Sequence, residues 1–247
     1  MKSLQDAADE VRENSLQMAE GRPEQEVIAA ACLLANDPNA KVRLQLATTL
    51  WGWQDPVASR ALIHLAQASG HIEMIRAAVL SSALPHLTAL AKASEKAKMP
   101  DAMTDGLLQT AAGAGNAEAL SLLMAPLLDR AMADADVETT VKHTTAVGSA
   151  WQALQRKGAR LAALAATQTG TADWQSLVAT ETALAEKLRR MADAASTPLR
   201  VRIAAAAALL AYDDKPSARD RAAGDDAARD RNCRFQDSRR SAEVQWE

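Results

Sequence analysis

The sequence predicts an all-α protein, built as an array of stacked antiparallel helical hairpins. Alanine and leucine, which favour helices, dominate the 247 residues, whereas aromatic residues, which are typical of strands, make up only 3% of them. A Val-Arg or Ile-Arg pair recurs along the chain, and apolar residues follow each pair at the three- and four-residue spacing of a helix face. A recurring unit of this kind is typical of helical repeat proteins.

Four pairs carry the repeat, namely Val11-Arg12, Val42-Arg43, Ile75-Arg76 and Val201-Arg202. An aspartate, Asp6 or Asp37, stands six residues before each of the first two arginines. Gly70 and Ser196 take this place in the third and fourth copies. The interval between Arg76 and Arg202 leaves room for further units of about thirty residues, which we expect to be degenerate over residues 91–190.

Polar residues followed by proline predict where helices begin. Asp37-Pro38 and Asp55-Pro56 place a capping carboxylate before a proline at the first helical position. We therefore expect one helix from Pro38 to near Trp53 and another from Pro56 onward. Thr197-Pro198 is expected to act in the same way before the last copy.

The middle of the chain keeps a helical pattern without the Val-Arg pair. Residues 91–105 are expected to form a charged helix end and a connection marked by a proline. A glycine-rich turn over residues 113–116 is expected to join two leucine-rich helices. Apolar spacing then predicts one helix over residues 137–154 and another over residues 174–191.

Residues 214–247 lose this pattern. They are rich in both acidic and basic residues and contain neither Leu nor Ile. Such a segment cannot bury enough apolar surface to offset the entropy lost on ordering, so we expect a charged, disordered tail. Truncation or a shifted reading frame would also explain the abrupt change, and an interaction tail is the remaining alternative.

The pattern resembles the HEAT repeat family, whose units pair two antiparallel helices and whose second helix typically opens with Asp, often Pro, and then Val-Arg. The copies at Arg12 and Arg43 match this pattern, and the copies at Arg76 and Arg202 match it in part because they lack the aspartate. The resemblance covers residues 1–90 and 190–213 and implies a right-handed α-solenoid over residues 1–213. It also implies a structural ladder between neighbouring units, made by Asp6, Arg12, Asp37, Arg43, Arg76 and Arg202.

A second resemblance concerns the segments that begin at Val11, Val42 and Ile75. They are similar to the HEAT segment of large exported bacterial proteins that join a dehydrogenase-like propeller, a helical array and a cytochrome c-type haem domain. This resemblance implies that the chain is a helical spacer of a haem-containing dehydrogenase. The haem attachment signature Cys-x-x-Cys-His is absent from the sequence.

The charge balance argues against nucleic acid as a partner. With 28 basic and 31 acidic residues, the net charge of −3 lacks the basic excess that phosphate binding usually needs. Cys32 and Cys233 form neither a disulfide framework nor a metal knuckle. No apolar run reaches the length of a membrane span, and the chain as written is expected to be soluble and cytoplasmic, or periplasmic if it belongs to a longer exported protein.

Four groups of residues resemble catalytic or metal-binding motifs, but each lacks an essential part. The spacing of His64, His71 and His86 fits no metal site, and Ser81 and Ser82 lack the glycine elbow that exposes a nucleophile. The other two groups are Gly113 with Gly115, without the third glycine of a dinucleotide site, and Asp134 with Asp136, without the rest of a calcium loop. The sequence thus predicts no catalytic residue, metal site or cofactor.

Trp51 and Trp53 are the candidate binding residues. They flank Gly52 at the end of a predicted helix, where both side chains cannot face the same core. We therefore expect one of them to be exposed and to mark a contact patch. The recurring arginines could instead line a groove for an acidic partner, although their place after an aspartate favours the ladder.

These features predict a non-catalytic scaffold that binds protein partners, because helical arrays offer long surfaces to extended ligands. The spacer of a haem-containing dehydrogenase is the alternative from another class. A third possibility is a lyase or isomerase that acts on a cofactor-bearing protein, as some HEAT-like proteins do. The sequence leaves the oligomeric state undetermined.

Overall fold

The computed structural model describes residues 2–22, 24–96, 99–133, 135–156, 158, 160–167 and 174–213. The chain divides into two compact units, Met1–Ala211 and Tyr212–Glu247, and the first holds nearly all of the described residues. Every regular element in the described ranges is a helix and none is a strand, so the all-α prediction is confirmed for them. The predicted tail, residues 214–247, lies outside this part of the chain.

The α-helices found in these ranges are α1 (Asp9–Ala19), α2 (Gln25–Cys32), α3 (Ala40–Thr49), α4 (Pro56–Ser69), α5 (Glu73–Ser81), α6 (Leu87–Lys96), α7 (Asp101–Ala114), α8 (Ala117–Met132), α9 (Val137–Arg156), α10 (Leu161–Thr167), α11 (Trp174–Asp193) and α12 (Leu199–Asp213). Short 3₁₀ helices accompany them, namely η1 (Lys2–Gln5), η2 (Leu33–Asn36), η3 (Leu50–Gly52) and η4 (Leu84–His86).

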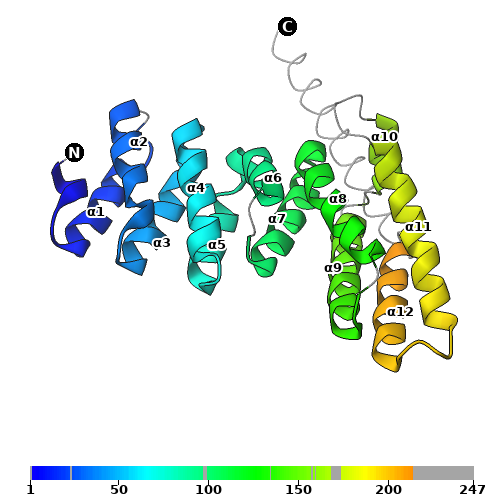
Figure 1. The fold of residues 1–247 in the computed structure, drawn as a ribbon. Helices are drawn as coiled ribbons and strands as arrows, with labels where there is room; N and C mark the ends of the chain where they lie inside the picture. The colour runs from blue at the N-terminus through cyan, green and yellow to red at the C-terminus, as the bar shows by residue number, and fades with distance from the viewer. Residues whose placement is uncertain are drawn as a thin grey trace, which may run out of the picture. The chain divides into compact units, whose positions relative to one another are not determined.

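The helices pack mainly against the helix two places along the chain (Figure 1). In one row, α1 contacts α3, α3 contacts α5, α5 contacts α7, and α7 contacts α9. In the other row, α2 contacts α4, α4 contacts α6, α6 contacts α8, and α8 contacts α11. Sequence neighbours such as α4 with α5 and α7 with α8 connect the two rows. Side chains between the rows, such as Leu46, Leu65 and Leu107, are fully buried.

The Val-Arg pairs occupy the same register in four helices. Val11, Val42, Ile75 and Val201 are each the third residue of their helix, in α1, α3, α5 and α12 respectively. The last three of these side chains are buried, whereas Val11, in the first α-helix, is 38% exposed. The apolar member of each pair therefore supplies core contacts wherever a preceding unit exists to cover it.

The predicted cap at Asp37 is wrong. The helix begins two residues after Pro38, and its N-cap is Asn39, whose side chain accepts a hydrogen bond from the Lys41 amide at 2.8 Å. The carboxylate of Asp37 cannot cap this helix, because it accepts hydrogen bonds from the Arg12 guanidinium and from the Asn39 amide.

The prediction that Pro198 is the first helical residue is wrong as well, because α12 begins at Leu199. The signals at Asp55, Gly115 and in the long middle helices are confirmed. Asp55 accepts a hydrogen bond from the Val57 amide at 2.6 Å and so caps α4, with Pro56 as the first helical residue. Gly115 ends α7 in the left-handed conformation, with φ of 65°, which a residue without a β-carbon adopts at little cost. Asn116 then caps α8. The predicted helices over residues 137–154 and 174–191 correspond to α9 and α11.

No single helix in the described ranges is long and apolar enough to cross a membrane. Only α5 taken together with the segment Leu84–Ser94 reaches that length and apolarity, and the two parts meet at a bend of 76°.

Candidate functional site

Three of the four predicted ladder arginines share one backbone contact. In each of the three, Nη1 donates a hydrogen bond to the carbonyl oxygen of the residue six places earlier. The pairs are Arg12 with Asp6 at 2.8 Å, Arg43 with Asp37 at 2.6 Å, and Arg76 with Gly70 at 3.4 Å. Arg202 differs, because its Nε donates to the carbonyl oxygen of Ala192 at 3.1 Å. The shared contact uses only the backbone of the accepting residue, so glycine serves there as well as aspartate.

A largely buried ion pair joins the first two units. Nε and Nη2 of Arg12 donate to Oδ2 and Oδ1 of Asp37 at 2.6 and 3.0 Å. Burial raises the pKa of Asp37, but the hydrogen bonds from Arg12 and from the Asn39 amide outweigh it, so this pKa lies below its ordinary value. Paired charges of this kind form the stronger class of hydrogen bond.

The next step of the predicted ladder lacks a carboxylate. Arg43 stands one unit after Arg12, and the residue that corresponds to Asp37 in the following unit is Gly70. The Nε of Arg43 is buried, and no described residue accepts a hydrogen bond from it. Within the described ranges, no arginine side chain lies within ion-pair distance of the Asp6 carboxylate, whose Oδ1 accepts a hydrogen bond from the Ala8 amide.

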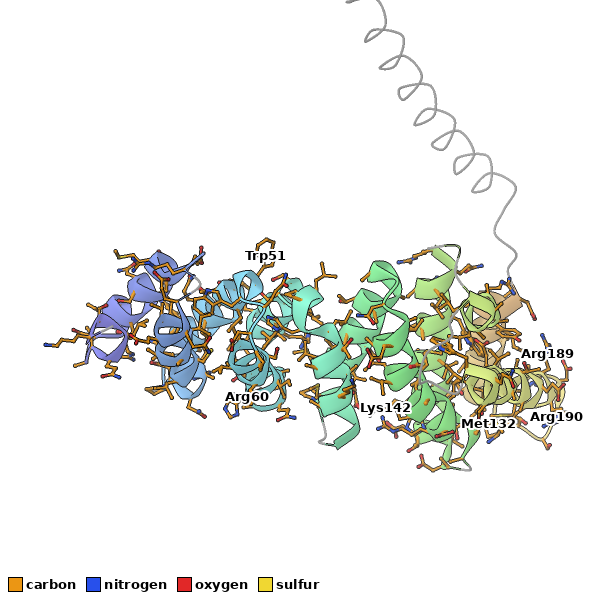
Figure 2. All side chains as sticks on the ribbon, turned by 90° about the horizontal axis from the view of Figure 1, so that it is seen from above. Trp51, Arg60, Met132, Lys142, Arg189 and Arg190 are labelled. Atoms are coloured by element: carbon orange, nitrogen blue, oxygen red, sulfur yellow. The ribbon has the colours of Figure 1, made fainter. Side chains whose placement is uncertain are left out.

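The structure separates the two candidate tryptophans. After α3 the chain turns through η3, which directs Trp51 outward and Trp53 inward. Trp51 is 63% exposed and Trp53 is 2% exposed. Figure 2 shows the Trp51 indole projecting from the ribbon. Of the two candidates, Trp51 is therefore the exposed one.

Trp51 is one of three exposed apolar side chains that recur at equal intervals in the sequence. Met18, Trp51 and Leu84 are 79%, 63% and 58% exposed. Met18 lies in the last turn of α1, Trp51 in the turn after α3, and Leu84 in the turn after α5, so each lies near the carboxyl-terminal end of its helix. Trp51 and Leu84 each stand nine residues after the apolar member of their Val-Arg or Ile-Arg pair, and Met18 stands seven residues after its own. We name these three residues the corner row. The equal interval between these three residues can be read from the sequence, but the spacing of apolar residues does not predict that their side chains are exposed.

Close contacts hold neighbouring corners together. Nε2 of His86, in η4, lies 3.0 Å from the carbonyl oxygen of Leu50 in η3, and Nδ1 lies 2.9 Å from Ser59 Oγ on α4. A β-carbon at Gly52 would lie 3.9 Å from the backbone nitrogen of Gly21, at the corner after α1. The members of the corner row therefore lie on directly packed units.

The other residues singled out from the sequence have structural surroundings. His86 is buried in the contacts just described, and burial lowers its pKa. Ser81 Oγ donates to the carbonyl oxygen of Ala78 at 2.8 Å. Across the described ranges, no three His, Cys, Asp or Glu side chains gather where they could hold a metal ion. Asp134 lies outside those ranges, and Asp136 accepts hydrogen bonds in the first turn of α9.

Cys32 is buried at the end of α2, and loss of solvent raises the pKa of its thiol to about 12. Because the thiolate is the reactive form, this cysteine is a core residue and a poor nucleophile.

Comparison with known protein families, with curated proteins and with solved structures finds no match to this chain. The function is therefore inferred from the described surface.

Proposed function

We propose that this chain is a HEAT-like α-solenoid that acts as a non-catalytic scaffold and binds a helical segment of a protein partner along the corner row. Three observations support the solenoid: the two rows of helix contacts, the common register of the Val-Arg pairs, and the repeated arginine contact to the backbone. A single hairpin cannot bury its own apolar face, so stacking of such units stabilises all of them.

The corner row carries the proposed binding function. Single exposed apolar residues are common on proteins, but these three large ones lie near the ends of α1, α3 and α5, helices that pack side by side in one row. Full burial of one such side chain in an interface contributes about 1.5–3 kcal/mol. Trp51 is the central member, and tryptophan is enriched among the residues that dominate binding energy.

The spacing of the row favours a helical ligand. Packed helices lie about 8–10 Å apart, and α1, α3 and α5 pack in this way, so they set the corners at about that interval. In a helix, residues seven apart share a face and lie about 10.5 Å apart. An extended strand repeats its face at about 6.6 or 13 Å, which fits less well. The ligand that matches is an amphipathic helix with apolar residues at heptad spacing.

The test uses a designed probe. A fluorescent, helical peptide of about 20 residues carries three leucines at heptad spacing on a background of Ala, Lys and Glu. A control peptide of the same composition carries the leucines five residues apart, which scatters them around the helix. Fluorescence anisotropy with the full chain is expected to show at least about tenfold tighter binding of the heptad peptide.

Matched variants locate the binding. Trp51→Ser is expected to weaken binding of the heptad peptide by about tenfold or more. Met74→Ser changes an equally apolar side chain, 65% exposed at the other end of α5, and is expected to leave binding unchanged. Equal binding of both peptides, or equal loss in both variants, would overturn the proposal. Self-association that Trp51→Ser abolishes would also overturn it, because the row would then contact a second copy of the chain.

A further inference from the structure

A cleft of about 740 Å³ lies between α7, α8 and α9. This volume is in the range of pockets that bind organic ligands. Leu108 of α7 and Leu123 and Leu127 of α8 form an apolar wall. Charged side chains from α7 and α9 also line the cleft, among them Asp105 and Lys142. In Figure 2, Lys142 and Trp51 lie on opposite sides of the ribbon, so the cleft is distinct from the corner row.

Pro126 lies inside α8 and also lines the cleft. Because proline has no amide hydrogen, the carbonyl oxygen of Leu122, four residues earlier, loses its helical donor. Pro126 itself contributes an apolar ring to the wall of the cleft.

Two carboxylates on α7 differ in their partners. Oδ2 of Asp101 lies 2.5 Å from Nζ of Lys142, and both side chains are 60% exposed, which places this ion pair at the mouth of the cleft. Asp105 lies one turn further along the same face and is partly buried. No described residue forms an ion pair or hydrogen bond with the Asp105 carboxylate.

The surroundings of Asp105 disfavour an unpaired negative charge. Loss of solvent and the charge of Asp101 raise the pKa of Asp105, while the attraction of Lys142 opposes this rise. A cation placed beside Asp105 would favour its charged form by attraction. The cleft therefore sets a carboxylate that has no ion-pair or hydrogen-bond partner among the described residues next to an apolar wall.

We propose that this cleft binds an organic cation, a primary ammonium or guanidinium on an apolar stem, with the charge at Asp105 and the stem along the leucine wall. The cation forms a charge-assisted hydrogen bond with Asp105, and the leucine wall covers its stem. The carboxylates of Asp101 and Asp105 would repel an organic anion, and Lys142 is already paired with Asp101. Arg130 also lines the cleft, but it is exposed, so water screens its attraction for an anion.

Ammonium and guanidinium groups on apolar stems occur in the lysine and arginine side chains of proteins and in free amines. Hexylamine tests the shared chemistry, with hexanol and hexanoate as neutral and anionic controls of similar stem length. Nα-acetyl-lysine methylamide represents a protein side chain, and spermidine represents a free polyamine. Tighter binding of one of the two identifies the source, and either result supports the cation site.

The experiment is a titration of the isotope-labelled full chain, followed by amide chemical shifts. Hexylamine is expected to shift residues around the cleft in a saturable way and more tightly than either control. Asp105→Asn is expected to weaken this binding by about tenfold, because it removes the charged acceptor. Asp101→Asn, the matched control, removes a carboxylate already paired with Lys142 and is expected to weaken binding by less than about threefold.

Asp105→Asn is expected to fold normally, because it removes an unpaired and partly desolvated charge, and circular dichroism checks this. Ala146→Leu supplies a second variant that fills the cleft from α9 and is expected to abolish hexylamine binding without a change in charge. Equal affinity of the wild type and Asp105→Asn, tighter binding of hexanoate, or shifts that never saturate would overturn the cation site. None of these outcomes depends on the corner row.

Discussion

Arg12 and Asp37 belong to neighbouring units, 25 residues apart in the sequence, and their side chains form a bidentate ion pair. The side chain of Asp37 is 2% exposed and that of Arg12 is 12% exposed. Asp37 also accepts a hydrogen bond from the Asn39 amide at 2.9 Å, so one buried carboxylate joins α1 to the start of α3. Removal of its charge leaves the Arg12 guanidinium without compensation in a largely buried place.

Asp37→Asn is therefore expected to lower the free energy of unfolding by about 2–3 kcal/mol, measured by urea denaturation at neutral pH. Because folding lowers the pKa of Asp37, its contribution is present above the pKa of an unfolded aspartate and is lost as the pH falls through the folded value. Asp6→Asn, at an exposed aspartate of the same repeat position, is expected to change stability by less than about 0.5 kcal/mol. Equal effects of the two substitutions would contradict this role for Asp37.

Gly70→Asp supplies a carboxylate at the position that corresponds to Asp37, yet we expect it to destabilise the chain by about 1–3 kcal/mol. A β-carbon at Gly70 would collide with the carbonyl oxygen of Ala66 and would lie 3.0 Å from Met103 Cε. Gly52→Ala is the matched control, since its β-carbon would meet nothing closer than 3.9 Å. Thermal unfolding compares the two variants, and a more stable Gly70→Asp protein would show that this collision does not govern the site.

Glu181 on α11 is buried and accepts a hydrogen bond from Trp151 Nε1 on α9 at 2.6 Å. Burial raises the pKa of Glu181 from 4.5 to about 7, against the effects of Trp151 and Arg160. Because folding raises this pKa, the stability that the group contributes is complete below pH 4.5 and declines as the pH rises toward about 7.

Glu181→Gln keeps the acceptor for Trp151 and removes the charge. It is expected to raise the free energy of unfolding at pH 8 by on the order of 3 kcal/mol and to change it little near pH 4.5. Urea denaturation at the two pH values measures the difference. A gain that is the same at both would mean that ionisation of Glu181 does not limit stability.

Trp51 and Trp53 are expected to respond very differently to truncation. Trp53→Ser removes a side chain that is 2% exposed and should lower the free energy of unfolding by about 3–5 kcal/mol. Trp51→Ser should change it by less than about 0.5 kcal/mol, because Trp51 makes most of its contact with solvent. Urea denaturation followed by circular dichroism compares them, and a large loss in Trp51→Ser would mean that this side chain packs within the array.

Helices whose ends are set by residues nearby in the sequence could be predicted. The cap at Asp55, the turn at Gly115 and the long helices α9 and α11 follow from caps, glycine and apolar spacing within one segment. The cap of α3 was not predictable in this way. Asp37 and Asn39 are both good caps, and the choice depends on Arg12, which binds the Asp37 carboxylate from another unit.

The candidate sites were less predictable, because each depends on contacts between segments. The pair of tryptophans predicts only that one of them is exposed. The tight turn of η3 determines that the exposed one is Trp51. Asp105 and Lys142 lie on different helices, and no sequence motif relates them. Their cleft exists because α7, α8 and α9 pack against one another in pairs.

The most direct measurement of the corner row uses nitroxide labels placed in pairs at Met18, Trp51 and Leu84, with Cys32→Ala and Cys233→Ser as the background. Electron paramagnetic resonance distances are expected to be nearly equal, about 10 Å, for the 18–51 and 51–84 pairs, and about 20 Å for the 18–84 pair. An 18–84 distance no longer than its two neighbours would contradict stacked units that present these residues at one repeated corner.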